Sequence, residues 1–243
     1  LKNGARLVKE FPHIPGVDFS GTVVESGHEN FESGDNIIAT GWRIGELYYG
    51  GYSQYAKVDG KFLVKRPKNL SSRQSMMLGT AGLTALQCAF AVKAREELLM
   101  GKKVEDVIVT GASGGVGSMS VMVLNKLNCN VTAVTGKKEN YDYLKTLGAK
   151  NLINSSDLDK EARPLDKGLY DGAVDTVGGN ILANVLSHIK DKGIVASCGN
   201  ASTIKLNTTV MPFIIRGIKL WGINSVDTSL KRRDFLWEES TNL

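Results

Sequence analysis

The spacing of hydrophobic and polar positions along the chain changes at about residue 70. In the first part, short apolar runs alternate with glycines and polar turns, and the spacing typical of helices is poor. This pattern predicts short strands over 16–26, 35–40, 50–58 and 61–67. The first part of the chain is therefore expected to form a small β domain, or part of one.

From about residue 72, predicted helices alternate with predicted strands. Two helical pieces within 71–94 are interrupted at Gly79–Gly82, and a polar connection with one short helix covers 155–170. Strands are expected over 106–110, 131–135, 151–154, 172–177, 193–199 and 218–223, with helices over 116–128, 141–148 and 181–190. This alternation indicates βαβ units and a parallel sheet. The final residues, 237–243, show no clear terminal element.

Composition and charge are those of an ordinary soluble globular protein. The 243 residues are enough for one large domain or two ordinary ones, and 42% of them are apolar against 23% charged. The net charge of +5 comes from scattered lysines and arginines. We interpret these basic residues as solvated surface. The alternative is that they attract anionic partners such as phosphates or coenzyme A. No basic stripe predicts a nucleic-acid partner.

Cysteine usage and hydropathy narrow the cellular setting. Cys88, Cys129 and Cys198 lie far apart and form no C-x-x-C pair. Neither a zinc lobe nor a disulfide framework is expected, and a reducing compartment, the cytoplasm, fits. No apolar run approaches the roughly 18 residues of a membrane span, so no membrane partner is expected. The chain begins at Leu1 rather than at Met, which suggests a fragment.

A glycine-rich turn, GASGGVG at residues 111–117, joins the first strand of the alternating series to its helix. In the frame of the dinucleotide fingerprint it is Ala112-x-Gly114-x-x-Gly117, and Ala112 departs from the usual first glycine. Gly114 would let backbone N–H groups approach a pyrophosphate at the helix N-terminus, and Gly117 would let helix and strand pack closely. The alternative is a glycine turn without a ligand, which the strand–turn–helix context disfavours.

The next strand ends in VTAVTGKK, residues 131–138, and carries no acid where NAD-binding sites place one. A carboxylate there accepts a hydrogen bond from the ribose 2′-hydroxyl and would repel a 2′-phosphate. Thr135 can donate a hydrogen bond, and Lys137 and Lys138 supply positive charge, so this segment predicts NADP(H) as the cofactor. The alternative is that the lysines are only the solvated start of a helix. Positive charge is mildly unfavourable at a helix N-terminus, which counts against this alternative.

Several stretches together resemble one protein family. They are IPGVDFSGTV, GGYSQYAKV, GTAGLTALQC, VTGASGGVG, YLKTLGAKNLIN, DGAVDTVGG and TTVMPFIIRGIKLWGINSV. These stretches are similar to the medium-chain dehydrogenase/reductase superfamily, and most of all to its zinc-free acryloyl-CoA reductase subgroup, often labelled quinone oxidoreductase. The resemblance implies an α/β fold, with a Rossmann doubly wound parallel sheet plus a partial GroES-like β domain.

The same resemblance implies a domain organisation. Residues 1–73 would be the partial GroES-like catalytic domain, 74–226 the Rossmann NADP-binding domain, and 227–243 the start of the return to the catalytic domain. The first strands and the last segment of the catalytic domain would lie outside this chain. An Asn-Tyr pair that lines the active site in relatives would lie there too, so no catalytic residue is assigned.

The resemblance also implies cofactor contacts where the motifs match. Ser113, Gly114, Gly115, Val116 and Gly117 fit the pyrophosphate turn. Thr135, Gly136 and Lys137 stand where relatives have a Ser-Gly-Arg that grips the 2′-phosphate, and the point charge of lysine implies a looser grip than the planar fork of arginine. Thr176, Gly199, Ile214 and Ser225 are expected around the adenosine or nicotinamide ends.

The implied activity is NADPH-dependent reduction of the C=C bond of an α,β-unsaturated acyl-CoA, with acryloyl-CoA to propanoyl-CoA as the leading assignment. One alternative is a broader NADPH-dependent quinone or enone reductase, and one of another class is a non-catalytic NADP(H)-binding sensor. Relatives are commonly homodimers, so a homodimer is expected.

No metal site is expected. Zinc alcohol dehydrogenases carry a metal ligand in a Gly-His-Glu segment, and the corresponding segment here has Val17 and Asp18 instead of His and Glu. His28 belongs to another Gly-His-Glu, in a polar turn that we interpret as surface. Cys198 is interpreted as a small buried residue, and Asp175 as a structural acid that fixes the turn after its strand.

Overall fold

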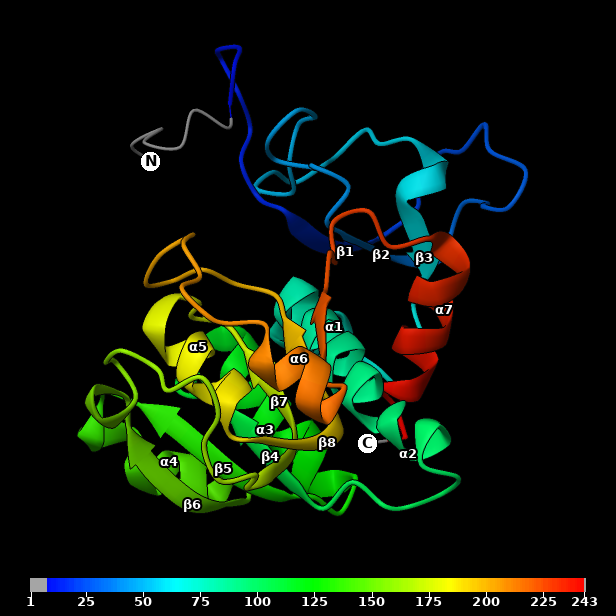
Figure 1. The fold of residues 1–243 in the computed structure, drawn as a ribbon. Coiled ribbons are helices and arrows are strands. Elements are labelled where there is room, and N and C mark those ends of the chain that lie inside the picture. The colour runs from blue at the N-terminus through cyan, green and yellow to red at the C-terminus, as the bar shows by residue number, and fades with distance from the viewer. Residues whose placement is uncertain (1–7, 243) are drawn as a thin grey trace. The chain divides into compact units, whose positions relative to one another are not determined.

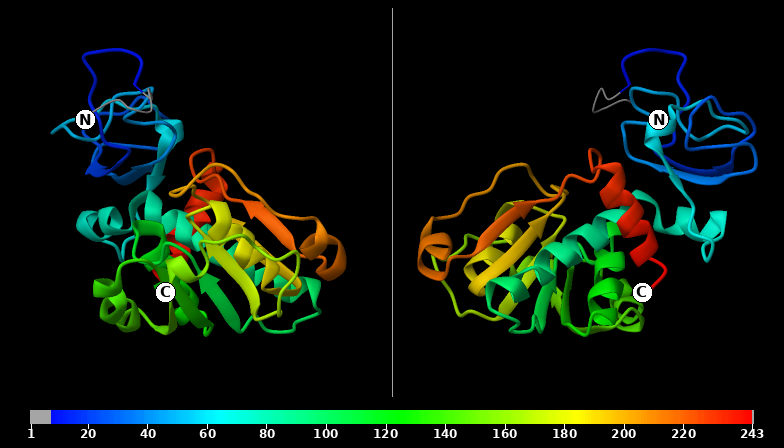
Figure 2. Two further views of the ribbon diagram at one scale, coloured as in Figure 1. Left: turned by 60° about the vertical axis from the view of Figure 1, so that its left-hand side comes forward. Right: turned by 90° about the vertical axis from the view of Figure 1, so that its right-hand side faces the viewer.

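The computed structural model describes residues 8–242 and divides the chain into two compact units. The first comprises Leu1–Leu83 with Asn224–Leu243, and the second comprises Thr84–Ile223. The chain therefore leaves the first unit, builds the second without interruption, and returns to the first at its end (Figures 1 and 2).

An antiparallel sheet of three strands forms the first unit, in the order β1–β2–β3. The strands are β1 (Asp18–Thr22), β2 (Asn36–Thr40) and β3 (Leu63–Lys65), and a short 3-10 helix, η1 (Gly60–Phe62), leads into β3. Strand β2 is central and supplies the buried Ile37 and Ala39, which pack with Phe62 and Leu63. The apolar runs of the sequence thus become one small core.

The strand predicted over 50–58 is wrong. That segment is a loop, and its Gly50 and Gly51 N–H groups donate to the carbonyls of Ile14 and Gly16 at 2.7 and 3.0 Å. A side chain on Gly50 would lie 2.3 Å from the Pro15 carbonyl oxygen, so the two backbones touch. Tyr52 and Tyr55 of this segment are exposed.

The chain end does form an element, contrary to the prediction. Helix α7 (Leu230–Glu239) packs in the first unit through the buried Leu236 and Trp237 and through Arg233, which is only 1% exposed. Four consecutive charged residues, 231–234, leave this helix with a weak periodic signal. Its anchoring comes from Arg233, whose contacts with distant carbonyls the sequence pattern does not reveal.

Helix α1 (Ser72–Lys93) has a kink at Gly79, where φ is 50° and ψ is −154°. The interruption predicted at Gly79–Gly82 is thus confirmed. The helix resumes at Thr80, whose N–H and hydroxyl both donate to the Asp18 carboxylate of β1, the former at 2.8 Å. Asp18, noted in the sequence only as a replacement for a metal-site residue, therefore caps a helical segment.

Among the described residues, the helical segment Ser72–Leu98, which comprises α1 and the short helix that follows it, is long and apolar enough to cross a membrane by length and composition alone. Of its most apolar window, 61% is buried inside the structure. The core helix of a folded domain meets the same two criteria.

A parallel sheet of six strands forms the second unit, in the order β6–β5–β4–β7–β8–β9. The strands are β4 (Asp106–Val109), β5 (Asn130–Thr135), β6 (Ala149–Asn154), β7 (Tyr170–Asp175), β8 (Ile189–Ser197) and β9 (Lys219–Gly222). The chain order reverses direction between β4 and β7, so the predicted doubly wound parallel sheet is confirmed. Ligands of such sheets bind at this switch point, outside the carboxyl ends of the strands.

Helices cover both faces of this sheet (Figure 1). Besides α1, the helices of the second unit are α2 (Arg95–Leu98), α3 (Gly115–Lys126), α4 (Tyr141–Thr146), α5 (Gly179–Ser187) and α6 (Met211–Arg216), with short 3-10 helices η2 (Lys138–Asn140) and η3 (Ser155–Asp157). Helix α5 packs Leu182 and Val185 on Ala173 of β7. Helix α1 covers the opposite face, where a Cβ on Gly172 would lie 2.6 Å from Val92.

A buried ion pair stabilises the amino-terminal edge of the sheet. Arg95 of α2 lies 3.0 Å from the carboxylate of Asp171 in β7, with both side chains almost wholly buried. Burial alone would raise the pKa of Asp171, but hydrogen bonds from the N–H groups of Asp106 and Glu105, with the charges of Lys190 and Arg95, hold it below its usual value. The buried charges at the amino-terminal edge of the sheet are therefore paired with one another and stabilise the fold.

Candidate cofactor site

The turn over 111–117 lies directly after β4, at the carboxyl edge beside the switch point. Gly111 adopts a φ of +58°, and a side chain there would lie 2.2 Å from the Thr176 hydroxyl. A Cβ on Gly117 would lie 2.2 Å from the Gly111 carbonyl oxygen. The close approach of helix and turn predicted for Gly117 is therefore present, and Gly111 supplies the freedom that the missing first glycine would have given.

The start of helix α3 presents free backbone donors. Gly114 is its N-cap residue, and the first helical bond is donated by Ser118 to the Gly114 carbonyl at 2.9 Å. The N–H groups of Gly115, Val116 and Gly117 precede this bond and have no acceptor within the helix. Gly114 and Gly115 are exposed, so an anion can approach these donors without displacing a side chain.

Thr135 ends β5 and lies next to this turn. Its hydroxyl shares a hydrogen bond of 2.8 Å with the Ser113 hydroxyl and accepts one of 3.1 Å from the Lys137 N–H. The side chain is only 3% exposed. Thr135 therefore ties the two turns together and fixes the backbone of Lys137, while Gly136, Lys137 and Lys138 are exposed beyond it.

Ser155 is a neighbour of this turn that the sequence reading did not include. It follows β6, which pairs in parallel with β5 so that Thr135 lies opposite Asn154. Its hydroxyl oxygen lies 2.9 Å from the position a Cβ would take on Gly136. The polar run after β6 was visible in the sequence, but only the strand pairing places it beside the Thr135–Lys137 turn.

The carboxyl ends of β7 and β8 complete this edge. Asp175 is fully buried and accepts hydrogen bonds from the Thr110 hydroxyl at 2.6 Å and the Gly178 N–H at 3.0 Å. Burial raises the pKa of this carboxyl above its usual value, although these hydrogen bonds oppose the rise. The structural role predicted for Asp175 is confirmed, because it fixes the turn after β7.

Thr176 and Gly199 are in direct contact at this edge. The Thr176 hydroxyl donates to the Thr110 carbonyl at 3.0 Å, and a Cβ on Gly199 would lie 2.5 Å from the Thr176 carbonyl oxygen. The two predicted residues therefore form one surface with Gly111.

Two predicted residues are not part of this cluster. Ile214 is 67% exposed on α6. Ser225 belongs to the first unit, where its carbonyl accepts a hydrogen bond of 2.8 Å from Arg233. Both stay predictions.

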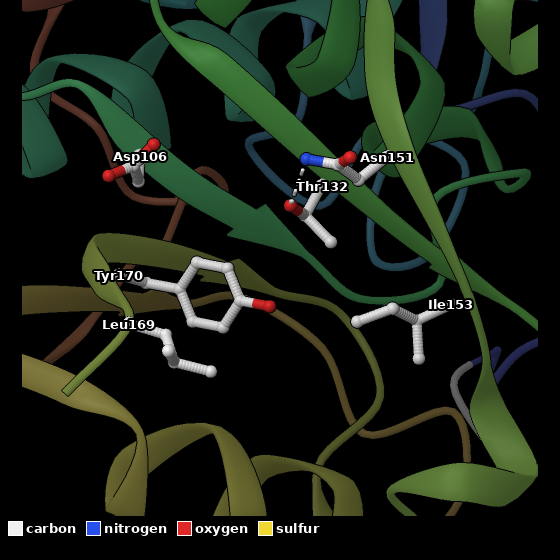
Figure 3. Close-up of a pocket in the computed structure, with 6 residues that line it drawn as sticks. All are labelled: Asp106, Thr132, Asn151, Ile153, Leu169 and Tyr170. Carbon is white, nitrogen blue, oxygen red and sulfur yellow. Dashed lines mark hydrogen bonds between the residues drawn. The ribbon is translucent and has the colours of Figure 1, made fainter. Parts of the chain in front are cut away.

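A hollow of the second unit lies away from this edge. It has a volume of about 410 Å³ and opens on the sheet face near the amino ends of the strands, where Tyr170 begins β7 and Asp106 begins β4 (Figure 3). The complete lining is Asp106, Thr132, Asn151, Ile153, Leu169 and Tyr170. Parallel sheets bind ligands at the opposite, carboxyl edge, so this hollow is not assigned to the cofactor.

Metal-ligating side chains do not converge within residues 8–242, where no group of three or more His, Cys, Asp or Glu residues is placed to hold an ion. His28 lies in a turn, where its Nδ1 accepts a hydrogen bond of 3.2 Å from the Asn30 N–H. Its ring packs against Phe31 with centroids 5.6 Å apart.

Comparison with known proteins gives the family. Residues 2–68 match the alcohol dehydrogenase GroES-like domain, and residues 115–237 match the family described as zinc-binding dehydrogenase. The acrylyl-CoA reductase AcuI of Ruegeria pomeroyi is 44% identical over 97% of this chain and 71% of that protein. The chain belongs to the medium-chain dehydrogenase/reductase superfamily, a family of oxidoreductases.

Two solved structures are similar over nearly the whole chain. The YhdH oxidoreductase of Salmonella enterica in complex with NADP is 43% identical, with a TM-score of 0.92 over 98% of this chain and 72% of that one. The Bacillus subtilis protein YhfP, a putative quinone oxidoreductase, was solved with NAD bound and is 41% identical, with the same TM-score and coverage. Relatives of nearly equal similarity thus carry different dinucleotides.

Proposed function

We propose that this protein is an NADPH-dependent reductase of the C=C bond of an α,β-unsaturated acyl-CoA, with acryloyl-CoA as substrate and propanoyl-CoA as product. The single observation that carries the proposal is the identity of 44% to an acrylyl-CoA reductase, spread over 97% of the chain. The geometry at the carboxyl edge of the sheet supports the dinucleotide part of it.

The residues at this edge fit NADP(H). The N–H groups of Gly115, Val116 and Gly117 at the start of α3 would bind the pyrophosphate, as expected for a helix N-terminus. Lys137 would hold the 2′-phosphate, and Thr135 would position the Lys137 backbone through the hydrogen bond of 3.1 Å. No carboxylate stands between Thr135 and Lys138 to repel that phosphate.

The chain's remaining cofactor contacts are proposed for Ser113, Gly114, Gly136, Thr176 and Gly199 at the same edge, and for Ile214 and Ser225 beyond it. When bound, the cofactor supplies a hydride to the β-carbon of the unsaturated thioester. The small residues Thr176 and Gly199 would leave room for the nicotinamide ring. Contact between the bound ring and these residues would exclude water. Hydrogen-bond donors aimed at the thioester oxygen would stabilise the charge that develops there.

The test uses NADPH carrying deuterium at C4, with acryloyl-CoA, followed by mass spectrometry of the product. The proposal predicts propanoyl-CoA with deuterium at the β-carbon. Absence of labelled propanoyl-CoA, with the enzyme still oxidising NADPH in the presence of a quinone, would contradict the thioester assignment and leave the cofactor assignment standing.

A quinone or enone reductase with the same cofactor is the second candidate. The observation that favours it is the 43% identity to the putative quinone oxidoreductase YhfP over 99% of the chain. Competition between acryloyl-CoA and a simple quinone in one assay separates the two candidates.

We also propose that the protein is a cytoplasmic homodimer that pairs along β9. This strand is the edge of the six-stranded sheet and is exposed along its length. Exposed apolar side chains lie on it and on the preceding α6, where Trp221 is 49% and Ile215 60% exposed. Such an edge is a template for pairing with a second copy. Light scattering should give a dimer for the parent protein and a monomer for Trp221→Lys, whereas Tyr143→Lys on α4 should stay dimeric.

A further inference from the structure

Two of the three cysteines lie on the same face of the parallel sheet. Ile194 pairs with Gly172 and Ala196 with Val174, so side chains 194, 196 and 198 alternate onto the face of Gly172. Helix α1 covers that face, since Val92 would lie 2.6 Å from a Cβ on Gly172. Cys88 is one helical turn before Val92, so it lies on the side of α1 that faces this part of the sheet, and the Cys88 and Cys198 thiols shift each other's pKa.

The two sulfurs have unequal surroundings. Cys88 is fully buried within α1, whereas Cys198 is partly exposed just beyond the end of β8. The Cys198 N–H donates to the Asp175 carbonyl at 2.9 Å, and its sulfur lies 3.5 Å from the same oxygen. The backbone therefore holds Cys198 in place against Cys88.

The two thiols shift each other's pKa in opposite directions. Donation from Cys88 lowers the pKa of the Cys198 thiol, although burial and the nearby Asp175 charge oppose this. The same hydrogen bond, with burial, raises the pKa of the Cys88 thiol. The thiolate is the reactive form, and Cys198 is the less buried of the two residues, so Cys198 is assigned as the thiol that meets an oxidant first.

We propose that Cys198 is an oxidant-sensitive modification site and that Cys88 is its resolving partner. The Cys198 sulfur attacks the O–O bond of a hydroperoxide, which forms a sulfenic acid and releases water or an alcohol. The Cys88 sulfur then attacks the Cys198 sulfur, which forms the S–S bond. The hydroxyl of the sulfenic acid leaves with the Cys88 proton as water. The two thiols together lose two electrons and two protons, and the hydroperoxide is reduced.

The modification would act on the carboxyl edge of the sheet. Cys198 immediately precedes Gly199, which packs against the Thr176 carbonyl. Drawing the Cys198 sulfur towards α1 would move this contact. The expected loss of NADPH affinity after oxidation rests on the proposed function, whereas the disulfide itself does not.

The test treats the reduced full-length protein with hydrogen peroxide, without cofactor, and follows it by intact mass and peptide mapping. The expected result is the loss of two hydrogen atoms per chain and a disulfide that links the Cys88 and Cys198 peptides, reversed by a thiol reductant. Failure of this disulfide to form, or its formation through Cys129, would overturn the proposal.

Three variants sharpen the test. Cys88→Ala should leave a sulfenic acid on Cys198 that dimedone traps, and Cys198→Ala should leave both remaining thiols reduced. Cys129→Ala is the matched control and should oxidise as the parent does, because Cys129 is buried near the Val104 carbonyl away from the pair. Equal dimedone labelling of the Cys88→Ala and Cys198→Ala proteins would contradict the assignment. If a variant does not fold, peptide mapping of the disulfide in the parent protein tests the proposal by itself.

Loss of NADPH affinity in the oxidised protein is measured separately. A disulfide that forms without changing NADPH binding would overturn the effect on the cofactor site but keep the modification site. A reduced protein that binds no NADPH would instead contradict the proposed function.

Discussion

The hydroxyls of Ser113 and Thr135 share a hydrogen bond of 2.8 Å that joins the turn after β4 to the turn after β5. Thr135 also accepts the Lys137 N–H at 3.1 Å. The residue expected to contact the 2′-phosphate directly is thus buried, and it works by holding the turn that presents Lys137.

Thr135→Val should therefore weaken NADPH binding through the backbone of the turn. The change keeps the shape but leaves the Ser113 hydroxyl and Lys137 N–H without this partner, a cost of about 1 kcal/mol, or roughly fivefold in affinity. Fluorescence titration with NADPH measures it. Thr146→Val on α4 is the control, since its hydroxyl bonds only locally to Tyr143. Equal affinities of the two variants would contradict this role.

Lys137→Ala should discriminate between the two dinucleotides. A charge-assisted hydrogen bond is worth about 1.5–3 kcal/mol, so NADPH affinity should fall roughly 10- to 100-fold while NADH affinity changes little. Lys145→Ala removes an exposed lysine of α4 paired with Asp142 and should alter neither affinity. Parallel losses for NADPH and NADH in Lys137→Ala would rule out a 2′-phosphate contact.

The Arg95–Asp171 pair should dominate the stability of the amino-terminal sheet edge. Arg95→Met removes one charged partner of a buried carboxylate that keeps Lys190 and two backbone N–H donors, so the free energy of unfolding should fall by about 1–3 kcal/mol. Urea denaturation measures this loss. The exposed pair Lys145–Asp142 is the reference, and Lys145→Met should cost less than about 1 kcal/mol.

Asp171 also gives this edge a pH dependence. Its pKa is lower in the folded protein than the unfolded value of about 3.9, so its contribution is present above that pH and is lost as the pH falls through the folded value. The unfolding free energy of the parent should therefore fall below about pH 4 more steeply than that of Asp171→Asn. Equal slopes for the two proteins would contradict this assignment.

Arg233 should be the main anchor of helix α7. Its guanidinium donates to the carbonyls of Thr40, Thr228, Ser225 and Val226 and to the Thr40 hydroxyl, and it lies 4.7 Å from the Trp42 ring. Burial lowers its pKa to about 10. Arg233→Lys keeps a charge but cannot reach these acceptors together, so thermal unfolding should show a loss of about 3 kcal/mol. Arg232→Lys, stacked on Phe235, should lose much less.

The sequence predicted the second unit more fully than the first, and the reason is physical. β-branched runs such as Val107, Ile108 and Val109 are buried on both faces and leave a strong signal. The loop over 50–58 shares the alternation of a strand, yet it is fixed by backbone contacts of Gly50 and Gly51 with Ile14 and Gly16. Such contacts depend on distant residues and leave no local pattern.

In the candidate site, too, local features could be predicted from the sequence and contacts between distant residues could not. The turn over 111–117 could be predicted because its glycines act within one strand–turn–helix unit. The contact of Ser155 with the Thr135–Lys137 turn could not, because it arises from the pairing of β5 with β6. The proximity of Cys88 to Cys198 likewise could not be predicted, because it requires α1 to lie over β7 and β8.

The most direct test of the central claim is kcat/KM of the full-length protein for acryloyl-CoA and a simple quinone, each with NADPH and with NADH. The account predicts that acryloyl-CoA with NADPH gives the highest value by a wide margin. A higher value for the quinone would contradict the acyl-CoA assignment. Equal values with NADH and NADPH would contradict the role given to Thr135 and Lys137.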